Sequence, residues 1–294
     1  MSDTAASLRR KSVGAEDLQS VVRTMKALAA SSITQYEQSV RALAHYRRTV
    51  SLGLGACLRA QGQAAPMTAE LRAVHQGATG ALVFGSDQGL VGRFNDVVAD
   101  HAIAALADLP GQTSVWAVGE RVQARLTDAG LPPAGVFPVP GSVQAIAPLV
   151  GQVQLAMESD RKQSVTAAIY VFHNHPRADG SYEPVSQRLL PLDASWQRQQ
   201  AKVAWPSSTR PEILGGGTGA LRALVREHLF ITIFQACAES LASENASRLA
   251  AMERADRNID DLLGELQSTF HRLRQASIDA ELFEVIAAYE SLAK

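Results

Sequence analysis

Residues 249–273 read LAAMERADRNIDDLLGELQSTFHRL, and the spacing of their apolar side chains decides the fold. Most of the steps are three or four residues, and the side chains concerned are Leu249, Met252, Ile259, Leu263, Leu266, Phe270 and Leu273. This is the period of one face of an α-helix. Because no proline follows Pro211, the pattern predicts a single helix from about residue 218 to 290. A helix of that length is typical of a coiled coil or a helical stalk.

The first sixty residues have the same period. Their apolar side chains at helical spacing are Leu18, Val22, Met25, Ala29, Ile33, Tyr36, Val40, Leu43, Tyr46, Val50, Leu54 and Leu58. The first proline is Pro66, so we expect one helix of about fifty residues, roughly 75–80 Å long.

The two end segments have opposite charge, which favours their pairing. Residues 1–60 hold nine basic and four acidic residues, whereas residues 218–294 hold eight basic and twelve acidic ones. In an antiparallel pair that starts near residues 60 and 218, facing residue numbers add up to roughly 278. Cys57 then faces residue 221 and lies too far from Cys237 for a disulfide. The longer C-terminal helix leaves about eighteen final residues beyond its partner.

The middle of the chain has an α/β pattern, and an antiparallel end-helix pair with an inserted Rossmann-like α/β domain is the expected fold. The expected domains are 1–60 (N-terminal coiled-coil helix), 70–207 (inserted α/β domain) and 218–294 (C-terminal coiled-coil helix). Within the insert we expect strands at 81–84, 114–118, 136–139 and 165–172, helices at 94–106, 121–129 and 143–157, an appended strand at 182–192, and a linker at 205–219.

Composition excludes several classes of protein. The 294 residues include 28 basic and 29 acidic ones, so a dedicated nucleic-acid binder is not expected. Two cysteines cannot form a disulfide framework, and the sequence has no C-x-x-C. No apolar run marks a secretion signal or a membrane span, so we expect a soluble protein of a reducing compartment.

Candidate chemical motifs are weak. Gly85, Gly89 and Gly92 follow an expected strand, but their spacing does not fit G-x-G-x-x-G, and we interpret them as a structural turn. His173 and His175 lack a clear third ligand, and we interpret them as a surface or turn pair rather than a metal site. No nucleophile motif is present. The sequence therefore predicts no catalytic residue, no cofactor and no metal ion.

Several segments do resemble a known family, the gamma subunit of F-type ATP synthases. The C-terminal segments 241–252, 266–278 and 281–285 closely resemble its last helix. At the other end, residues 24–31 (TMKALAAS) resemble its first helix, and residues 84–95 resemble its glycine turn. The resemblance covers nearly the whole chain in the right order.

The resemblance implies a central rotor shaft that carries no catalytic site of its own. It implies as partners the alpha and beta head subunits, the epsilon subunit and the membrane ring of c subunits, and a peripheral place at the cytoplasmic face of a bacterial cell membrane. It also implies that Met25 and Arg248 serve energy coupling and that Arg274 and Gln275 hydrogen-bond a catalytic-subunit loop. By residue number, Met25 and Arg248 are expected near the same level of the stalk.

The chain departs from the family at several positions, which favours a divergent, alternative F-type ATPase branch. The family usually carries more lysines in the first helix, where this chain has Glu16, Asp17, Ser31, Ser32 and Gln35. Two other functions remain open from the sequence. One is a nucleotide-binding Rossmann-type enzyme with oligomerisation helices, and the other is a coiled-coil adaptor.

Overall fold

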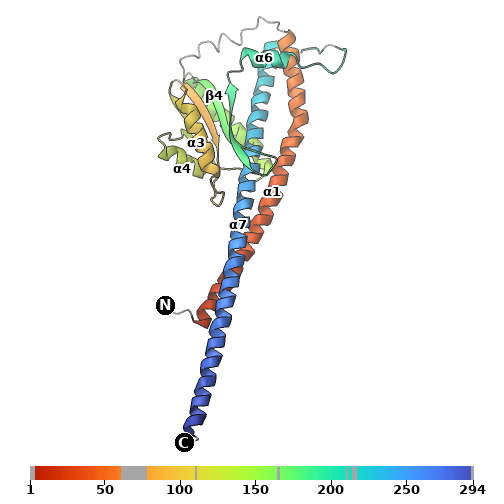
Figure 1. The fold of residues 1–294 in the computed structure, drawn as a ribbon. Helices are drawn as coiled ribbons and strands as arrows, with labels where there is room; N and C mark the ends of the chain where they lie inside the picture. Colours follow the sequence, from red (N-terminus) through yellow and green to blue (C-terminus); the bar gives the residue numbers. More distant parts are fainter. Residues whose placement is uncertain are drawn as a thin grey trace. The chain divides into compact units, whose positions relative to one another are not determined.

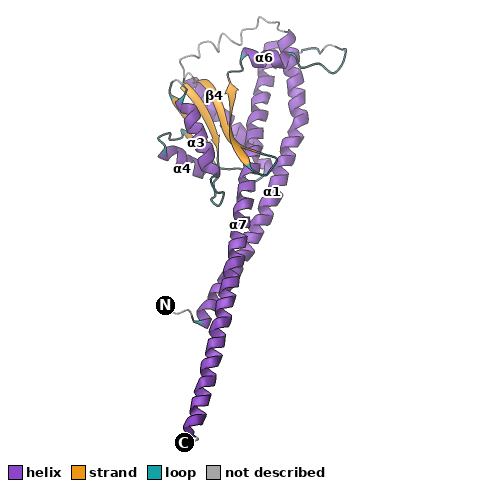
Figure 2. Cartoon of the chain, viewed as in Figure 1, coloured by secondary structure: helices purple, strands orange, loops and turns teal. Residues whose placement is uncertain are grey.

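The computed structural model describes residues 4–60, 78–109, 111–163, 166–209, 211–213 and 217–292. Two long helices dominate it, α1 (Ala5–Ala60) and α7 (Gly217–Leu292), with strands and shorter helices between them in sequence (Figures 1 and 2). The chain forms two compact units. The smaller unit contains Met1–Ala29 and Arg248–Lys294, and the larger contains Ala30–Ser247. The expected domain boundary at residue 70 lies outside the described residues.

The larger unit is built on a five-stranded sheet with the order β3-β2-β1-β4-β5. Its strands are β1 (Ala78–Phe84), β2 (Thr113–Val118), β3 (Gly135–Phe137), β4 (Thr166–Pro176) and β5 (Tyr182–Leu190). The first four are parallel, and β5 is the antiparallel edge strand that the sequence predicts as an appended arm. The α/β fold of the insert is thus confirmed.

Helices cover both faces of this sheet. On one face, α3 (Phe94–Ala107) and α4 (Glu120–Asp128) pack on residues such as Val83 and Phe172. On the other face, α5 (Val143–Gln163) and the α7 residues from Ile233 to Ala242 pack on Leu82, Phe84 and Val171. The C-terminal helix is therefore part of the main core of this unit as well as part of the helix pair.

The sequence did not predict α6 (Ala194–Ala201), which follows the edge strand. Asp193 caps its start by accepting a hydrogen bond from the Trp196 backbone N–H. Arg59 at the end of α1 donates to the carbonyl oxygens of Ala201 and Val203, at 2.9 and 2.7 Å. These bonds attach α6 and the residues after it to the end of α1.

The helix pair of the larger unit has the expected antiparallel register. Tyr46 donates to Glu227 at 2.6 Å, which raises the pKa of Tyr46, and Cys57 shares an apolar cluster with Leu221. Both cysteines are free and buried, and Cys237 belongs to a different cluster. The prediction that Cys57 faces residue 221 rather than Cys237 is therefore confirmed.

The smaller unit is a two-helix pair with a heptad seam. Buried or half-buried positions follow alternating steps of four and three: in α1 they include Leu8, Ser12, Ala15, Gln19, Val22, Lys26 and Ala29, and in α7 Met252, Asp256, Ile259, Leu263, Leu266, Phe270 and Leu273. The expectation that Leu18 lies in the seam is wrong, because its side chain is 62% exposed. Its neighbour Gln19 takes that position and bonds to α7.

Candidate subunit-contact site

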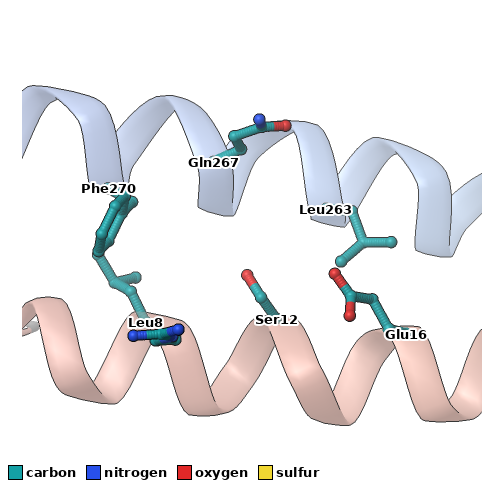
Figure 3. Close-up of a pocket in the computed structure, with 7 residues that line it drawn as sticks. Leu8, Ser12, Glu16, Leu263, Gln267 and Phe270 are labelled. Carbon is teal, nitrogen blue, oxygen red and sulfur yellow. The ribbon is translucent and has the colours of Figure 1, made fainter.

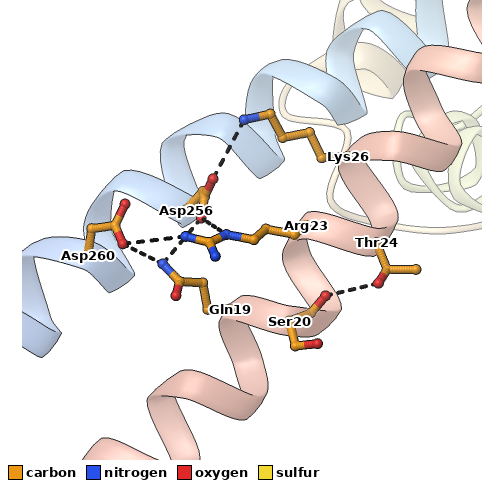
Figure 4. A network of polar contacts seen from close by, with 7 residues as sticks. All are labelled: Gln19, Ser20, Arg23, Thr24, Lys26, Asp256 and Asp260. Atoms are coloured by element: carbon orange, nitrogen blue, oxygen red, sulfur yellow. Dashed lines mark hydrogen bonds and ion pairs between the residues drawn. The ribbon is translucent and has the colours of Figure 1, made fainter.

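A polar network joins the two helices of the smaller unit (Figure 4). Asp256 of α7 accepts a hydrogen bond from Arg23 at 3.3 Å and lies 3.5 Å from the Lys26 ammonium. Gln19 donates to both Asp256 and Asp260. Asp256 is largely buried, with a side chain 16% exposed, whereas Arg23 is 60% exposed. The basic N-terminal helix and the acidic C-terminal helix therefore pair through their charges, as the sequence predicts.

This network fixes the register of the pair. Gln19 with Asp260 and Arg23 with Asp256 both give residue numbers that add up to 279, beside the expected value near 278. The register places residue 254 opposite Met25, six residues or about 9 Å along the helix from Arg248. Met25 and Arg248 are therefore offset by less than two helical turns, and they do not face each other.

A groove of about 600 Å³ lies further along the seam (Figure 3). Leu8 and Phe270 line one end and Glu16 and Leu263 line the other. Between them, the small Ser12 side chain points toward α7, while Gln267 on α7 points away (Figure 3). The groove is thus a packing gap beside the small Ser12 side chain.

Beyond this seam, the end of α7 is exposed on all sides. Among the residues whose burial the structure describes, Leu273 is the last half-buried one, and every residue from Arg274 to Ile286 is exposed. The overhang expected from the helix lengths is therefore confirmed. Its exposed apolar side chains are Ile278, Leu282, Phe283, Val285 and Ile286, of which Phe283 is 69% exposed. Tyr289, which the sequence groups with them, has a side chain outside the described residues.

The glycine turn of the larger unit, residues 84–95, allows a close approach between the loop and the helices beside it. A Cβ on Gly85 would lie 2.3 Å from Val122 Cβ and 2.7 Å from Asn95 Oδ1, so only glycine fits there. Asn95 accepts a hydrogen bond from the Ser86 backbone N–H at 2.9 Å, and Asp87 accepts from the backbone N–H groups of Glu120 and Val139. The polar groups of the loop thus bond within the domain, in agreement with its interpretation as a structural turn.

The turn also contacts the C-terminal motif. Ser247 Oγ donates to the Val91 carbonyl oxygen, and one turn earlier Ser243 Oγ donates to the Asn174 carbonyl oxygen at 2.9 Å. Residues 241–245 of α7 are all buried. The segment 84–95 therefore meets residues 241–247 of the C-terminal segment within this unit.

The interpretation of His173 and His175 as a surface or turn pair is wrong. Both lie on the face of β4 that carries Val171, because side chains two apart share a face, and this face packs on α7. Glu239 of α7 accepts hydrogen bonds from His173 Nε2 and His175 Nδ1, both at 2.9 Å, through one oxygen, Oε2. No third candidate ligand lies near the two histidines in the sequence. The fold supplies one, the Glu239 carboxylate of the distant helix α7.

This Glu239 carboxylate is held in its charged form. Burial on its own opposes ionisation, but hydrogen bonds from His173, Gln235 and His175 outweigh it and lower the pKa of Glu239 to about 2. Its other oxygen, Oε1, accepts from Gln235 Nε2 at 2.6 Å. The strand–helix contact therefore contains a largely buried carboxylate that is ionised at neutral pH.

Comparison with known proteins identifies the family. The curated ATP synthase gamma chain of Polaromonas sp. strain JS666 is 26% identical over 287 residues, which cover 95% of this chain and 96% of that protein. A family model described as ATP synthase matches residues 4–292. The chain belongs to the ATP synthase gamma-subunit family.

Solved structures show the same gamma-subunit fold. A chain in the rotor of the Euglena gracilis mitochondrial ATP synthase aligns with a TM-score of 0.62 and 16% identity, covering 93% of this chain and 98% of that one. A chain in the central stalk and c-ring assembly of the Tetrahymena thermophila mitochondrial enzyme aligns with a TM-score of 0.55 and 18% identity, covering 80% and 99%. The end-helix pair with its α/β insert is thus the gamma-family architecture.

Proposed function

We propose that this chain is the central rotor shaft of an F-type ATP synthase and mechanically couples ion translocation through the membrane sector to ATP synthesis or hydrolysis in the catalytic head. The observation that carries this proposal is the end of α7. The helix is continuous over 76 residues, and no other part of the chain that the structure describes covers its stretch from Arg274 to Ile286.

The exposed apolar end requires a partner. Burying one large aliphatic or aromatic side chain is worth about 1.5–3 kcal/mol, and five such side chains stand exposed between Ile278 and Ile286. A sleeve formed by the alpha and beta head subunits covers them in our proposal. An apolar sleeve provides contact without fixed polar bonds, so the helix turns inside it at little cost.

Four residues carry the subunit contacts in this proposal. Arg274 and Gln275, the first two exposed residues after the seam, hydrogen-bond a carboxylate-bearing loop of a catalytic subunit. Met25 and Arg248 serve energy coupling through separate contacts, since the register of the helix pair does not make them face each other. The α/β domain faces the epsilon subunit and the ring of c subunits.

The same proposal places the chain at the cytoplasmic face of a bacterial cell membrane, as a peripheral subunit without a catalytic or cofactor site of its own. Among the helices that the structure describes, none is both long and apolar enough to cross a lipid bilayer. The Rossmann-type enzyme is the weaker alternative, because the polar groups of its candidate nucleotide loop bond to Asn95, Glu120 and Val139 within the domain.

Co-assembly tests the proposal. The full chain is co-expressed with the alpha and beta subunits from its own source and passed over a sizing column, with head subunits alone as the control. We expect the chain to elute with the head subunits at one copy per hexamer and to support ATP hydrolysis. A chain that elutes as a free monomer and binds NAD would instead favour the enzyme.

A further inference from the structure

We propose that His173, His175 and Glu239 form a binding site for a divalent transition-metal ion, zinc above all, which joins strand β4 to helix α7. The two imidazole nitrogens and the carboxylate oxygen all lie within 4.8 Å of one another. All three residues belong to the larger unit, so the site lies within one compact body.

The chemistry of the ligands selects the ion. Two imidazoles and one carboxylate are a set that zinc uses in sites where a fourth position stays open for water. Calcium and magnesium prefer ligand sets made of oxygen alone, so they do not match two nitrogens. Binding requires that each histidine turns a nitrogen lone pair toward the ion, in place of the N–H that it now donates to Glu239.

Two of the three distances between ligand atoms need little change to accept the ion. Tetrahedral zinc with arms of about 2.0–2.1 Å places its ligand atoms about 3.3 Å apart. The two nitrogen–oxygen distances are 2.9 Å, so each has to open by about 0.4 Å. His173 Nδ1 has no hydrogen-bond partner among the described residues, so the change of tautomer breaks no hydrogen bond there, but it leaves a buried N–H whose cost zinc binding has to outweigh.

The surrounding residues hold the ligands in place, as outer-shell groups do in metal sites. Gln235 occupies the second oxygen of Glu239 and in turn accepts a hydrogen bond from Arg47, which leaves Oε2 for the ion. The strand between the histidines is fixed from both sides. Ser243 donates to the Asn174 carbonyl oxygen, and the Asn174 side chain donates to the Phe94 carbonyl oxygen.

The site also has an entrance. The side chains of His173 and Glu239 are 4% and 9% exposed, whereas that of His175 is 44% exposed. The ion therefore enters past His175, and water on that side supplies the fourth ligand. Once bound, it links the edge of the sheet to α7 and stiffens the connection between the inserted domain and the shaft.

Titration of the full-length protein with zinc tests the site. After treatment with a chelator and buffer exchange, zinc chloride is titrated calorimetrically, and Co²⁺ is added in parallel to record the visible absorption band of a tetrahedral site. We expect one zinc per chain with a micromolar or tighter dissociation constant. His175→Ala and Glu239→Gln should each weaken binding at least about tenfold.

A matched control separates this site from adventitious binding by histidine. His45 is exposed on α1, outside the cluster, so His45→Ala should leave the affinity and the cobalt spectrum unchanged. His175→Ala removes a part-exposed side chain, and unchanged thermal unfolding without zinc verifies that it folds. No zinc bound by the wild type, or equal affinity in wild type, His175→Ala and Glu239→Gln, would overturn the proposal. Neither result bears on assembly with the head subunits.

Discussion

Two stretches of the same helix have opposite surroundings. From Ile231 to Asn245, α7 is buried on nearly every side by the sheet, α5 and α1, and only Gln235 is half-buried. From Arg274 to Ile286 every residue is exposed, although this stretch also carries large apolar side chains. The first stretch is covered by its own chain, whereas in our proposal the second is covered by the head subunits.

The polar residues of the two stretches differ in the same way. In the first, several polar side chains bond within the unit: Glu239 to two histidines, Ser243 to Asn174, and Gln235 to Glu239. In the second, Arg274 and Gln275 extend into solvent. Substitutions in the first stretch should therefore change folding stability, and substitutions in the second should change assembly and coupling.

The same substitution in both stretches should give the largest contrast. Ile233→Ala empties a site that is 2% exposed and should lower the free energy of unfolding by about 2–5 kcal/mol. Ile278 is 53% exposed, so Ile278→Ala should change the free energy of unfolding by less than about 0.5 kcal/mol. Urea unfolding of the isolated chain measures both, and equal effects would remove the distinction between the two stretches.

A smaller contrast is expected in the pH dependence of stability. The pKa of Glu239 is lowered from 4.5 to about 2, so its ionisation stabilises the fold fully above pH 4.5 and is lost as the pH falls toward 2. In metal-free buffer, Glu239→Gln should cost up to about 3 kcal/mol at pH 7 and progressively less below pH 4.5. The exposed Glu284→Gln is the control. A cost for Glu239→Gln that does not change between pH 7 and 3.5 would contradict this reading.

In the exposed stretch, the double variant Arg274→Ala with Gln275→Ala should leave stability unchanged but reduce ATP synthesis or hydrolysis severalfold. Hydrogen bonds between a charged group and a neighbour contribute about 1.5–3 kcal/mol, which is enough to hold one rotary dwell. Turnover is measured in the assembled complex. Wild-type turnover would show that hydrogen bonds from these two residues do not hold the rotor at a dwell position.

Met25→Lys should have a weaker effect, on coupling rather than on turnover. Met25 lies half-buried between the cations Arg23 and Lys26, and a further cation there repels charges at a cost of about 1 kcal/mol. ATP hydrolysis should persist while ATP-driven ion pumping by membrane vesicles declines. Unchanged pumping would count against a coupling role for this position.

The smallest effect is expected for the charged network of the helix pair. Asp256→Asn removes the partner of Arg23 and Lys26 and should cost about 0.5–1 kcal/mol at low salt and less at high salt. The exposed Asp261→Asn on the same helix is the control. A salt-independent cost would mean that Asp256 acts through packing instead of charge.

The helix pair could be predicted from the sequence because its signal is local and periodic. Heptad spacing, the absence of proline and helix length are enough to place Cys57 opposite residue 221 and to leave the end of α7 unpaired. Leu18 was misassigned because a polar residue, Gln19, takes the seam position, and an apolar period cannot reveal a hydrogen-bonded seam.

The histidine cluster could not be predicted in this way. Alternation along β4 places His173 and His175 on one face. Their partner Glu239, however, lies 66 residues after His173 and 64 residues after His175. Only the packing of the sheet on α7 brings these groups together.

Hydrogen exchange of backbone amides along α7 tests the central claim most directly. The isolated chain is compared with the chain assembled with the alpha and beta subunits. Amides from Ile233 to Asn245 should be protected in both states, because the chain itself buries them. Amides from Arg274 to Ile286 should exchange rapidly in the isolated chain and become protected on assembly. If this last stretch exchanges equally fast in the assembled complex, the head subunits do not cover it and the account is wrong.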